Sequence, residues 1–524
     1  MLSSLRLPPI ADQPDPEVET RAVFLEEWVE ALPYAHPVAL LDTYLEALRR
    51  CNRSPMKVNQ RLALLEIFLR PYEYLLELQE RQGPIHSVSS IERYRADTEA
   101  ARRAAEELAY GYKTVLVHGT TRRTLWGGKR EGALAAQRAM LFLSLVLIHS
   151  YDEYLPIPTG VWPELHALML YARSEGIDEM APVGKPKRPE YARDCATTYK
   201  QMLLASLVDP YHLGYGLVWK MYQLLGTVAD AAVLGPFAKV SRPAGIFVIA
   251  PRSDHHPRPY LKFDETPPDG AQLLDANPVT ERLQGLASTA DGPRRTLIAT
   301  TMRAFGLPPK RHSPREIATG RVRLTTSLSS LHHFLAGRDS TPPTAPDPAP
   351  DSDADIEIDI DADEPTTGAT PEHSYTAEYW ELLDQGPGGV GVIKRLRPNQ
   401  AVGVGEIIGI QTPTGDQQGS WSVGVVRWLS IANAGEYQIG VQLMARRAEA
   451  VGILAAEATS PSPALLLRGE EGSERATLIT APGLLPKGLD LTLTSAAGET
   501  TAAHVERVIE RATHFQHLAI RTGD

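Results

Sequence analysis

The spacing of apolar residues changes near residue 240, and this change decides the fold class. Before it, apolar side chains recur every three or four residues, as at Leu41, Tyr44 and Leu48, which is the period of an amphipathic helix. After it, short apolar or alternating runs such as GIFVIAP, EIIGIQ and WSVGVVRWL are separated by Gly, Asn and Asp. Such runs are typical of strands joined by tight turns. We therefore predict a multidomain α+β protein that is helical first and β later.

The first 235 residues are predicted to form an all-α domain, either a bundle or an irregular solenoid. Ser54 and Pro55 have the residue types of a helix N-cap and first helical position, and Pro71 is expected to kink or break the helix that follows. Further helices are predicted over roughly 95–118, 132–153, 161–175, 187–208 and 212–234. His332 and His333, in contrast, are predicted to alternate across a strand.

At 524 residues the chain is too long for one hydrophobic core. We predict a helical domain over 1–235, a mixed α/β connecting module over 236–308, and a small antiparallel β-barrel over 309–450. A disordered acidic insert at about 338–376 interrupts the barrel, and an accessory β unit follows over 451–524. The regular spacing of short strands after the insert is the reason for predicting a barrel.

The acidic insert carries nearly the whole net charge of the chain. Residues 341–373 contain ten Asp and Glu and no Lys or Arg, against a net charge of −11 for the chain. Such a segment repels itself and lacks the apolar residues needed for a core, so we predict a solvated linker. It has no glycine at the sixth position of a calcium loop, so no metal site is assigned to it. The overall acidic balance argues against a nucleic-acid polymer as partner.

Several classes of protein find no support in the sequence. Cys51 and Cys195 are the two cysteines, and neither belongs to a CxxC pair, which fits a reducing cytoplasm. The longest apolar run, LFLSLVLI, has eight residues and indicates a buried helix, so we expect no membrane insertion. Phosphate-binding GxxxxGK[ST], HExxH and GxSxG motifs are absent from the sequence, and we expect no enzyme, no cofactor and no metal.

The stretch KRHSPR contains the first candidate binding residues. Arg311 and Arg315 have an R-x-x-x-R spacing, and Pro314 removes a backbone donor and disfavours the α region at Ser313. The segment is therefore extended or turn-like. For so short a pattern taken alone, a solvated basic linker is the favoured explanation. A binding role is supported only if a target for the arginines follows.

A possible target lies after the acidic insert, in WELLDQGPGGVGV. Asp384, Gly386 and Gly389 follow the spacing D-x-G-x-x-G. An arginine pair entering a small barrel, followed by a [D/N]-x-S-x-x-G turn, resembles the PilZ domain, whose members bind cyclic di-GMP. GVVRWL and EYQIGVQLMA also resemble the closing strands of PilZ barrels. The resemblance covers about 309–450 and says nothing specific of the helical half.

The resemblance implies a role for each residue. Arg311 and Arg315 would fold over the ligand, because a guanidinium group binds guanine or phosphate in a bidentate manner. Asp384 would accept a hydrogen bond from a guanine edge, and Gly389 would allow a tight turn. Gly386 stands where the motif has serine, which removes one hydroxyl contact worth about 1 kcal/mol. The earlier stretch TTSLSSLH is a rival for the motif turn, but it offers neither Asp/Asn nor glycine.

The resemblance implies a bacterial cyclic di-GMP receptor. Binding would change domain packing or the binding of an unidentified protein partner through the helical domain. By the same resemblance, the regulated process would be a surface-associated behaviour such as type IV pili, flagellar motility, exopolysaccharide output or biofilm formation. The alternative is a degenerate PilZ interaction scaffold that binds no nucleotide.

Overall fold

The structure is a computed structural model that describes 2–82, 85, 88–121, 128–182, 188–260, 267–306, 314–337, 375–396, 402–412, 419–432, 435–455, 460–468, 476–483, 485–512 and 514–523. The chain divides into two compact units. Unit 1 comprises Met1–His312, Arg395–Val404 and Trp428–Gln438. Unit 2 comprises Ser313–Lys394, Gly405–Arg427 and Ile439–Asp524.

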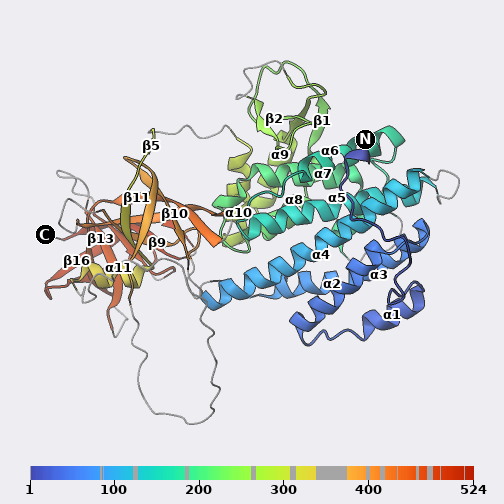
Figure 1. The fold of residues 1–524 in the computed structure, drawn as a ribbon. Helices are drawn as coiled ribbons and strands as arrows, with labels where there is room; N and C mark the ends of the chain where they lie inside the picture. The colour runs from blue at the N-terminus through green and yellow to red at the C-terminus, as the bar shows by residue number, and fades with distance from the viewer. Residues whose placement is uncertain are drawn as a thin grey trace, which may run out of the picture. The chain divides into compact units, whose positions relative to one another are not determined.

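Unit 1 is built mainly from helices (Figure 1). Its first eight α-helices are α1 (Ala22–Glu30), α2 (Pro37–Arg53), α3 (Val58–Arg81), α4 (Val88–Thr121), α5 (Lys129–Asp152), α6 (Val161–Glu175), α7 (Cys195–Leu207) and α8 (Leu217–Gly226). The prediction of a helical N-terminal domain is confirmed.

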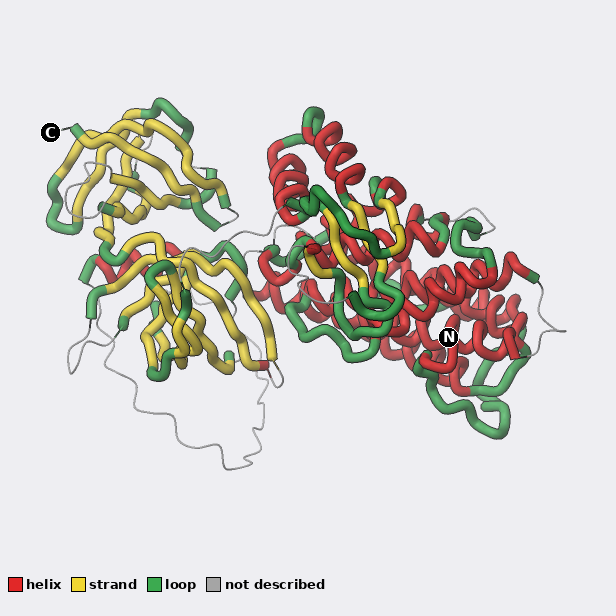
Figure 2. Tube along the Cα trace, turned by 90° about the horizontal axis from the view of Figure 1, so that it is seen from above, coloured by secondary structure: helices red, strands yellow, loops and turns green. Residues whose placement is uncertain are grey.

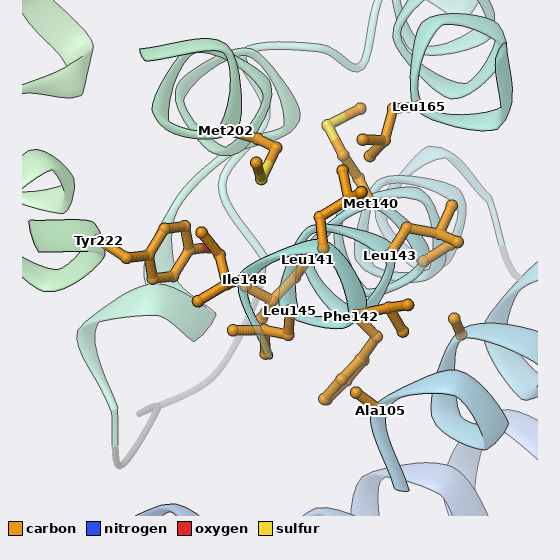
Figure 3. Packing of buried hydrophobic residues seen from close by; sticks show 14 of the residues in the cluster. Ala105, Met140, Leu141, Phe142, Leu143, Leu145, Ile148, Leu165, Met202 and Tyr222 are labelled. Carbon is orange, nitrogen blue, oxygen red and sulfur yellow. The ribbon is translucent and has the colours of Figure 1, made fainter. Parts of the chain in front are cut away.

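Helix α5 lies at the centre of the unit 1 core. Its side chains are buried almost without interruption from Gly132 to Asp152. Figure 3 shows Phe142 facing α4, with Met202 of α7 and Tyr222 of α8 on the other side of the same helix. The Phe142 ring stacks on Tyr112 of α4 at a centroid distance of 5.8 Å. A helix that is apolar all round has to be covered on every face, and this requirement gathers the neighbouring helices around α5.

Among the described helices, α5 alone has the length and composition of a membrane span. Its most apolar 18-residue window has a mean hydropathy of 1.5, and 94% of that window is buried inside the protein. The eight-residue apolar run therefore understates α5, which could cross a membrane by length and composition alone. The prediction that LFLSLVLI lies within a buried helix is confirmed.

Unit 1 also buries charged side chains. Lys113 Nζ donates to Glu164 Oε2 at 2.6 Å, and both side chains are almost fully buried. Arg6 donates to the other oxygen of Glu164 at 2.7 Å, which ties the N-terminal segment to α6. Asp152 accepts from Tyr94 and from Gln79 Nε2, and burial raises the pKa of Asp152 to about 7. Each buried charge here has a partner, as burial in a low dielectric requires.

A small mixed module completes unit 1. Its antiparallel sheet has the order β1-β4-β2-β3, from β1 (Val233–Pro236), β2 (Ile246–Ile249), β3 (Arg258–Pro259) and β4 (Gln272–Asp275). Helices α9 (Asn277–Ala287) and α10 (Gly292–Ala304) follow, and Asp291 caps α10 by accepting from the Arg294 amide at 2.9 Å. Leu274, Val279 and Ile298 join the main core of unit 1.

The first part of unit 2 is a sheet that closes on itself, which we call the first barrel. The sheet order is β5-β7-β6-β9-β10-β11-β8, and a further β7–β8 pairing closes it. Helix α11 (Leu328–Leu335) follows β6. The strands are β5 (Glu316–Ile317), β6 (Arg321–Thr326), β7 (Glu378–Gly386), β8 (Gly389–Arg395), β9 (Ile407–Gln411), β10 (Trp421–Ala432) and β11 (Glu436–Ala445).

The second part of unit 2 is a closed six-stranded barrel, which we call the second barrel (Figure 2, strands in yellow). Its order is β12-β13-β14-β17-β16-β15, from β12 (Ala448–Ala455), β13 (Ser462–Leu467), β14 (Ala476–Thr480), β15 (Asp490–Ser495), β16 (Thr500–Arg511) and β17 (Gln516–Thr522). The predicted fold class, helices followed by a small barrel and a further β unit, is confirmed.

The two barrels share one apolar core around α11. Leu331 and Phe334 of α11 pack in the same cluster as Trp421 of β10, Leu465 of β13 and Phe515. The Phe334 and Trp421 rings stack at a centroid distance of 5.3 Å. The second barrel is therefore joined to the first by packing as well as by the chain.

Three local predictions differ from the structure. Helix α3 is not broken at Pro71 but continues through it, and Pro71 is itself buried, so tertiary packing outweighs the lost hydrogen bond. Ser54 does not cap α3, which starts at Val58. It ends α2, and its Oγ accepts from the Asp15 amide at 3.2 Å. His332 and His333 lie on α11 and not on a strand, because Ser327 caps a helix there by accepting from the Ser330 amide.

Candidate functional site

The candidate site lies where β5, β7 and β8 run side by side in the first barrel. Ile317 of β5 pairs with Asp384 of β7, and Asp384 pairs in turn with Gly391 of β8. Directly paired residues of antiparallel strands project to the same face of a sheet. Arg315 precedes Ile317 by two residues and therefore belongs to that face as well. The register thus brings a cation, a carboxylate and an aliphatic side chain together.

Arg315 and Asp384 form an ion pair at this face. Arg315 Nη1 donates to Asp384 Oδ1 at 2.8 Å, and both side chains are about one-third exposed. A partly exposed pair of this kind contributes roughly 0–1 kcal/mol to stability, so its main effect is to position the two groups. The guanidinium has five N–H donors in a planar fork. Bonding to Asp384 through Nη1 is therefore compatible with binding a second anionic or acceptor group.

Glycines allow three close approaches around this ion pair. A Cβ on Gly386 would lie 2.9 Å from the Pro314 carbonyl oxygen, so glycine lets the arginine-bearing segment lie against the end of β7. A Cβ on Gly389 would lie 2.3 Å from the Val441 carbonyl oxygen of β11. A Cβ on Gly391 would lie 2.9 Å from Asp384 Oδ1. Each distance is shorter than ordinary van der Waals contact. Gly386 and Gly389 face backbone oxygens and are required by space, whereas Gly391 faces a side-chain carboxylate that can move.

The structure brings four of the five predicted site residues together. Arg315, Asp384, Gly386 and Gly389 all lie at the β5–β7–β8 edge of the first barrel. Arg311 lies outside the described residues. The predicted acidic insert, 341–373, also lies outside them.

Two residues of this site were missed by the sequence analysis. Gly391 holds the space for the Asp384 carboxylate, and Ile317 stands beside Asp384 with 93% of its surface exposed. Gly391 falls two residues after the motif, and only the strand register reveals its position opposite Asp384. Ile317 lies two residues after Arg315, but its exposure and its place beside Asp384 are visible only in the structure.

The described residues contain no group of three or more His, Cys, Asp or Glu arranged to hold a metal ion. His256 Nδ1 lies 2.8 Å from the Pro257 carbonyl oxygen, and burial lowers the pKa of this histidine. Cys51 and Cys195 are both buried, and burial raises the pKa of their thiols to about 11 and about 12. Such thiols stay protonated near neutral pH and are poor nucleophiles.

A closed barrel with Arg315 at its edge, D-x-G-x-x-G on the β7–β8 hairpin and the closing strands β10 and β11 is typical of a PilZ-type domain. Two family models match the chain. "Cyclic-di-GMP receptor FimW, N-terminal domain" matches residues 22–239, and "Cyclic-di-GMP receptor FimW, middle PilZ domain" matches residues 339–450. Together they match more than half of the chain. The chain is therefore a PilZ-domain protein that is similar to this family over both matched regions.

One curated relative is similar over nearly the whole chain. It is "Cyclic-di-GMP receptor FimW" of Pseudomonas aeruginosa, 24% identical over 543 residues, and the alignment covers 92% of this chain and 87% of the relative. No solved structure matches the chain. The middle-domain match begins at residue 339, so Arg315, β5 and β6 lie before it, although β5 and β6 belong to the same sheet.

Proposed function

We propose that this protein is a cyclic di-GMP receptor whose binding site is the β5–β7–β8 edge of the first barrel. The observation that carries the proposal is the ion pair of Arg315 and Asp384 beside the Gly386–Gly389 hairpin. The name of the Pseudomonas aeruginosa relative, over an alignment of 92% of this chain, supports the same ligand.

The chemistry of the site suits a dinucleotide that carries two guanines and two phosphates. Arg315 and Arg311 are proposed to clamp phosphate or the O6 and N7 acceptors of guanine. Asp384, held by Arg315, is proposed to accept from the N1–H or N2–H₂ edge of guanine. An arginine that already contacts Asp384 loses less side-chain freedom on binding than a free one, which favours affinity.

The proposed consequence of binding is a change in domain packing or in a protein partner's access to the helical domain. Such a receptor is proposed to act in the cytoplasm of a bacterium and to regulate type IV pili, flagellar motility or exopolysaccharide output. The helical unit is the proposed partner surface. No catalytic role is proposed for any residue.

A second candidate function is an interaction scaffold that binds no nucleotide. Gly386 favours it, because the serine of the motif is missing and the Pro314 carbonyl oxygen lies only 2.9 Å from where a serine Cβ would stand. In this alternative, Arg315 and Asp384 only fasten β5 to β7. The affinity of the protein for cyclic di-GMP therefore distinguishes the two candidate functions.

The test is isothermal titration of the full-length protein with cyclic di-GMP, after removal of any bound nucleotide. We expect a dissociation constant that is micromolar or lower, and a loss of at least 100-fold in the double variant R311A/R315A. R321A is the matched control, because Arg321 lies on β6 of the same sheet and is 4.0 Å from Glu381. No binding by the wild type at low salt would leave the scaffold as the function.

A further inference from the structure

Ile317 is an exposed aliphatic side chain beside the candidate binding residues. It is 93% exposed, whereas large aliphatic side chains in the first barrel, such as Val392 and Val441, are fully buried. Single exposed apolar residues are common on protein surfaces and carry no meaning by themselves. What sets Ile317 apart is its register, because it pairs directly with Asp384 on β7.

The register fixes which groups surround Ile317. Side chains of directly paired residues in an antiparallel sheet have Cβ atoms roughly 4.5–5.5 Å apart, so Ile317 adjoins the Asp384 carboxylate. Arg315, two residues earlier on the same strand, is on the same face and bonds to Asp384 at 2.8 Å. Ile317 is therefore a neighbour of both polar groups of the candidate site.

A ligand held by Arg315 and Asp384 has to cover Ile317 as well. A purine ring with its edge at Asp384 extends well beyond one strand spacing, which is about 4.8 Å. Its flat apolar face then lies over the neighbouring strand position, where Ile317 stands. The exposed isoleucine would lose contact with water, and this gain adds to the polar contacts.

We infer that Ile317 is a further binding residue of the nucleotide site, and that its aliphatic side chain packs against a purine ring of the ligand. This inference rests on the proposed function. It assigns Ile317 the apolar part of recognition, while Arg315 and Asp384 supply the polar part. The three groups together match a ligand that is planar and apolar on its faces and polar at its edge.

The first experiment compares the dissociation constants of cyclic di-GMP for the full-length wild type, I317A and I317V. We expect I317A to bind about five- to tenfold more weakly, since it loses most of the buried aliphatic surface, and I317V to stay within about twofold to threefold. I509A is the matched control, because Ile509 lies on β16 of the second barrel and is 39% exposed. It is expected to bind like the wild type.

The second readout follows the isoleucine itself. In protein labelled at the isoleucine δ1 methyl groups, the Ile317 resonance is assigned by its disappearance in I317V. Nucleotide binding is expected to shift this resonance through the ring current of the purine, while the Ile509 resonance stays in place. Because each resonance reports on one side chain, this result does not depend on how a variant folds.

The outcomes separate this inference from the proposed function. If the wild type binds and R315A does not, but I317A keeps the wild-type constant and the Ile317 methyl resonance does not move, the inference is wrong and Ile317 is only an exposed residue of a short edge strand. If the wild type itself does not bind, the proposed function is wrong and this inference falls with it. A weaker I317A together with a shifted methyl resonance supports both.

Discussion

Two glycines of the first barrel and two of the second are needed for different reasons. In the first barrel, Gly389 and Gly424 sit where an added Cβ would lie 2.3 and 2.4 Å from atoms of Val441. In the second barrel, Gly488 and Gly498 have φ of +86°, and nothing lies within 4 Å of an added Cβ. These two glycines of the first barrel are thus required for space, and these two of the second for backbone conformation.

This difference shows where each barrel can tolerate change. A left-handed turn glycine costs about 1–2 kcal/mol when replaced, and the change stays in the turn. Where glycine is required because another atom approaches closely, a larger residue displaces the neighbouring strand or side chain. In the first barrel, such glycines adjoin the Arg315–Asp384 pair, so close strand packing and binding depend on the same residues.

G389A is expected to have the largest effect, because the new Cβ would meet the Val441 backbone and β8 or β11 has to move. We expect a loss of about 1–3 kcal/mol in the free energy of unfolding, measured by urea denaturation, together with at least tenfold weaker nucleotide binding. The control is G498A in the second barrel, which is expected to cost about 1 kcal/mol and leave binding unchanged. Equal effects of both variants on binding would contradict the comparison.

G391A is expected to have a smaller and more selective effect. Its Cβ would lie 2.9 Å from Asp384 Oδ1, and a side-chain carboxylate moves more easily than a backbone carbonyl. The Asp384 carboxylate should rotate away and lose its bond to Arg315, so binding weakens several-fold while the free energy of unfolding falls by less than about 1 kcal/mol. Calorimetry and urea denaturation of the same variant measure both quantities. A loss of stability without a change in affinity would show that Gly391 serves strand packing only.

E510Q is expected to have the smallest effect, and it tests a contact between the two barrels. Glu510 of β16 accepts from both Nη atoms of Arg427 of β10, at 2.7 and 3.0 Å, and this contact lowers the pKa of Glu510. A lowered carboxyl pKa stabilises the fold above the unfolded value of about 4.3, and this stability is lost as the pH falls through the folded value.

The measurement for this contact is the difference in unfolding free energy between the wild type and E510Q at several pH values. We expect under about 1 kcal/mol at pH 6, because the pair is one-third exposed, and a decline toward zero below pH 4. E506Q provides the control, since Glu506 lies on the same strand and is 4.0 Å from Arg521. A difference that grows as the pH falls would have the wrong sign for this mechanism.

Periodicity sufficed to predict the fold class but not the local exceptions. The change from helical to strand spacing near residue 240 corresponds to the succession of helices and barrels. The helix at His332 and His333 was missed because the Ser- and Thr-rich stretch before it suits a strand or a helix. The change occurs at Ser327, which follows β6, has a φ of +76° and caps α11. The prediction for Pro71 considered only the local cost of proline within a helix. It did not include the burial of the surrounding α3 side chains, which stabilises the continuous helix.

The candidate site was predictable as far as it follows a motif. Arg315, Asp384, Gly386 and Gly389 could be chosen by their spacing, and the structure places them at one barrel edge. Gly391 and Ile317 could not be chosen, because their importance arises from cross-strand pairing with Asp384. A sequence shows which residues follow one another, and a one-residue change of register would place both on the opposite face.

The apolar core shared by the two barrels extends beyond the region that the middle-domain family model matches. The middle-domain match ends at residue 450, yet Val423 and Val425 of β10 pack in one cluster with Leu465 and Phe515, which lie beyond it. A polypeptide trimmed at that boundary would present this apolar strand face to water and would be prone to aggregate. The matched region and the region that folds as one unit therefore end at different residues, because the second barrel covers an apolar face of the first.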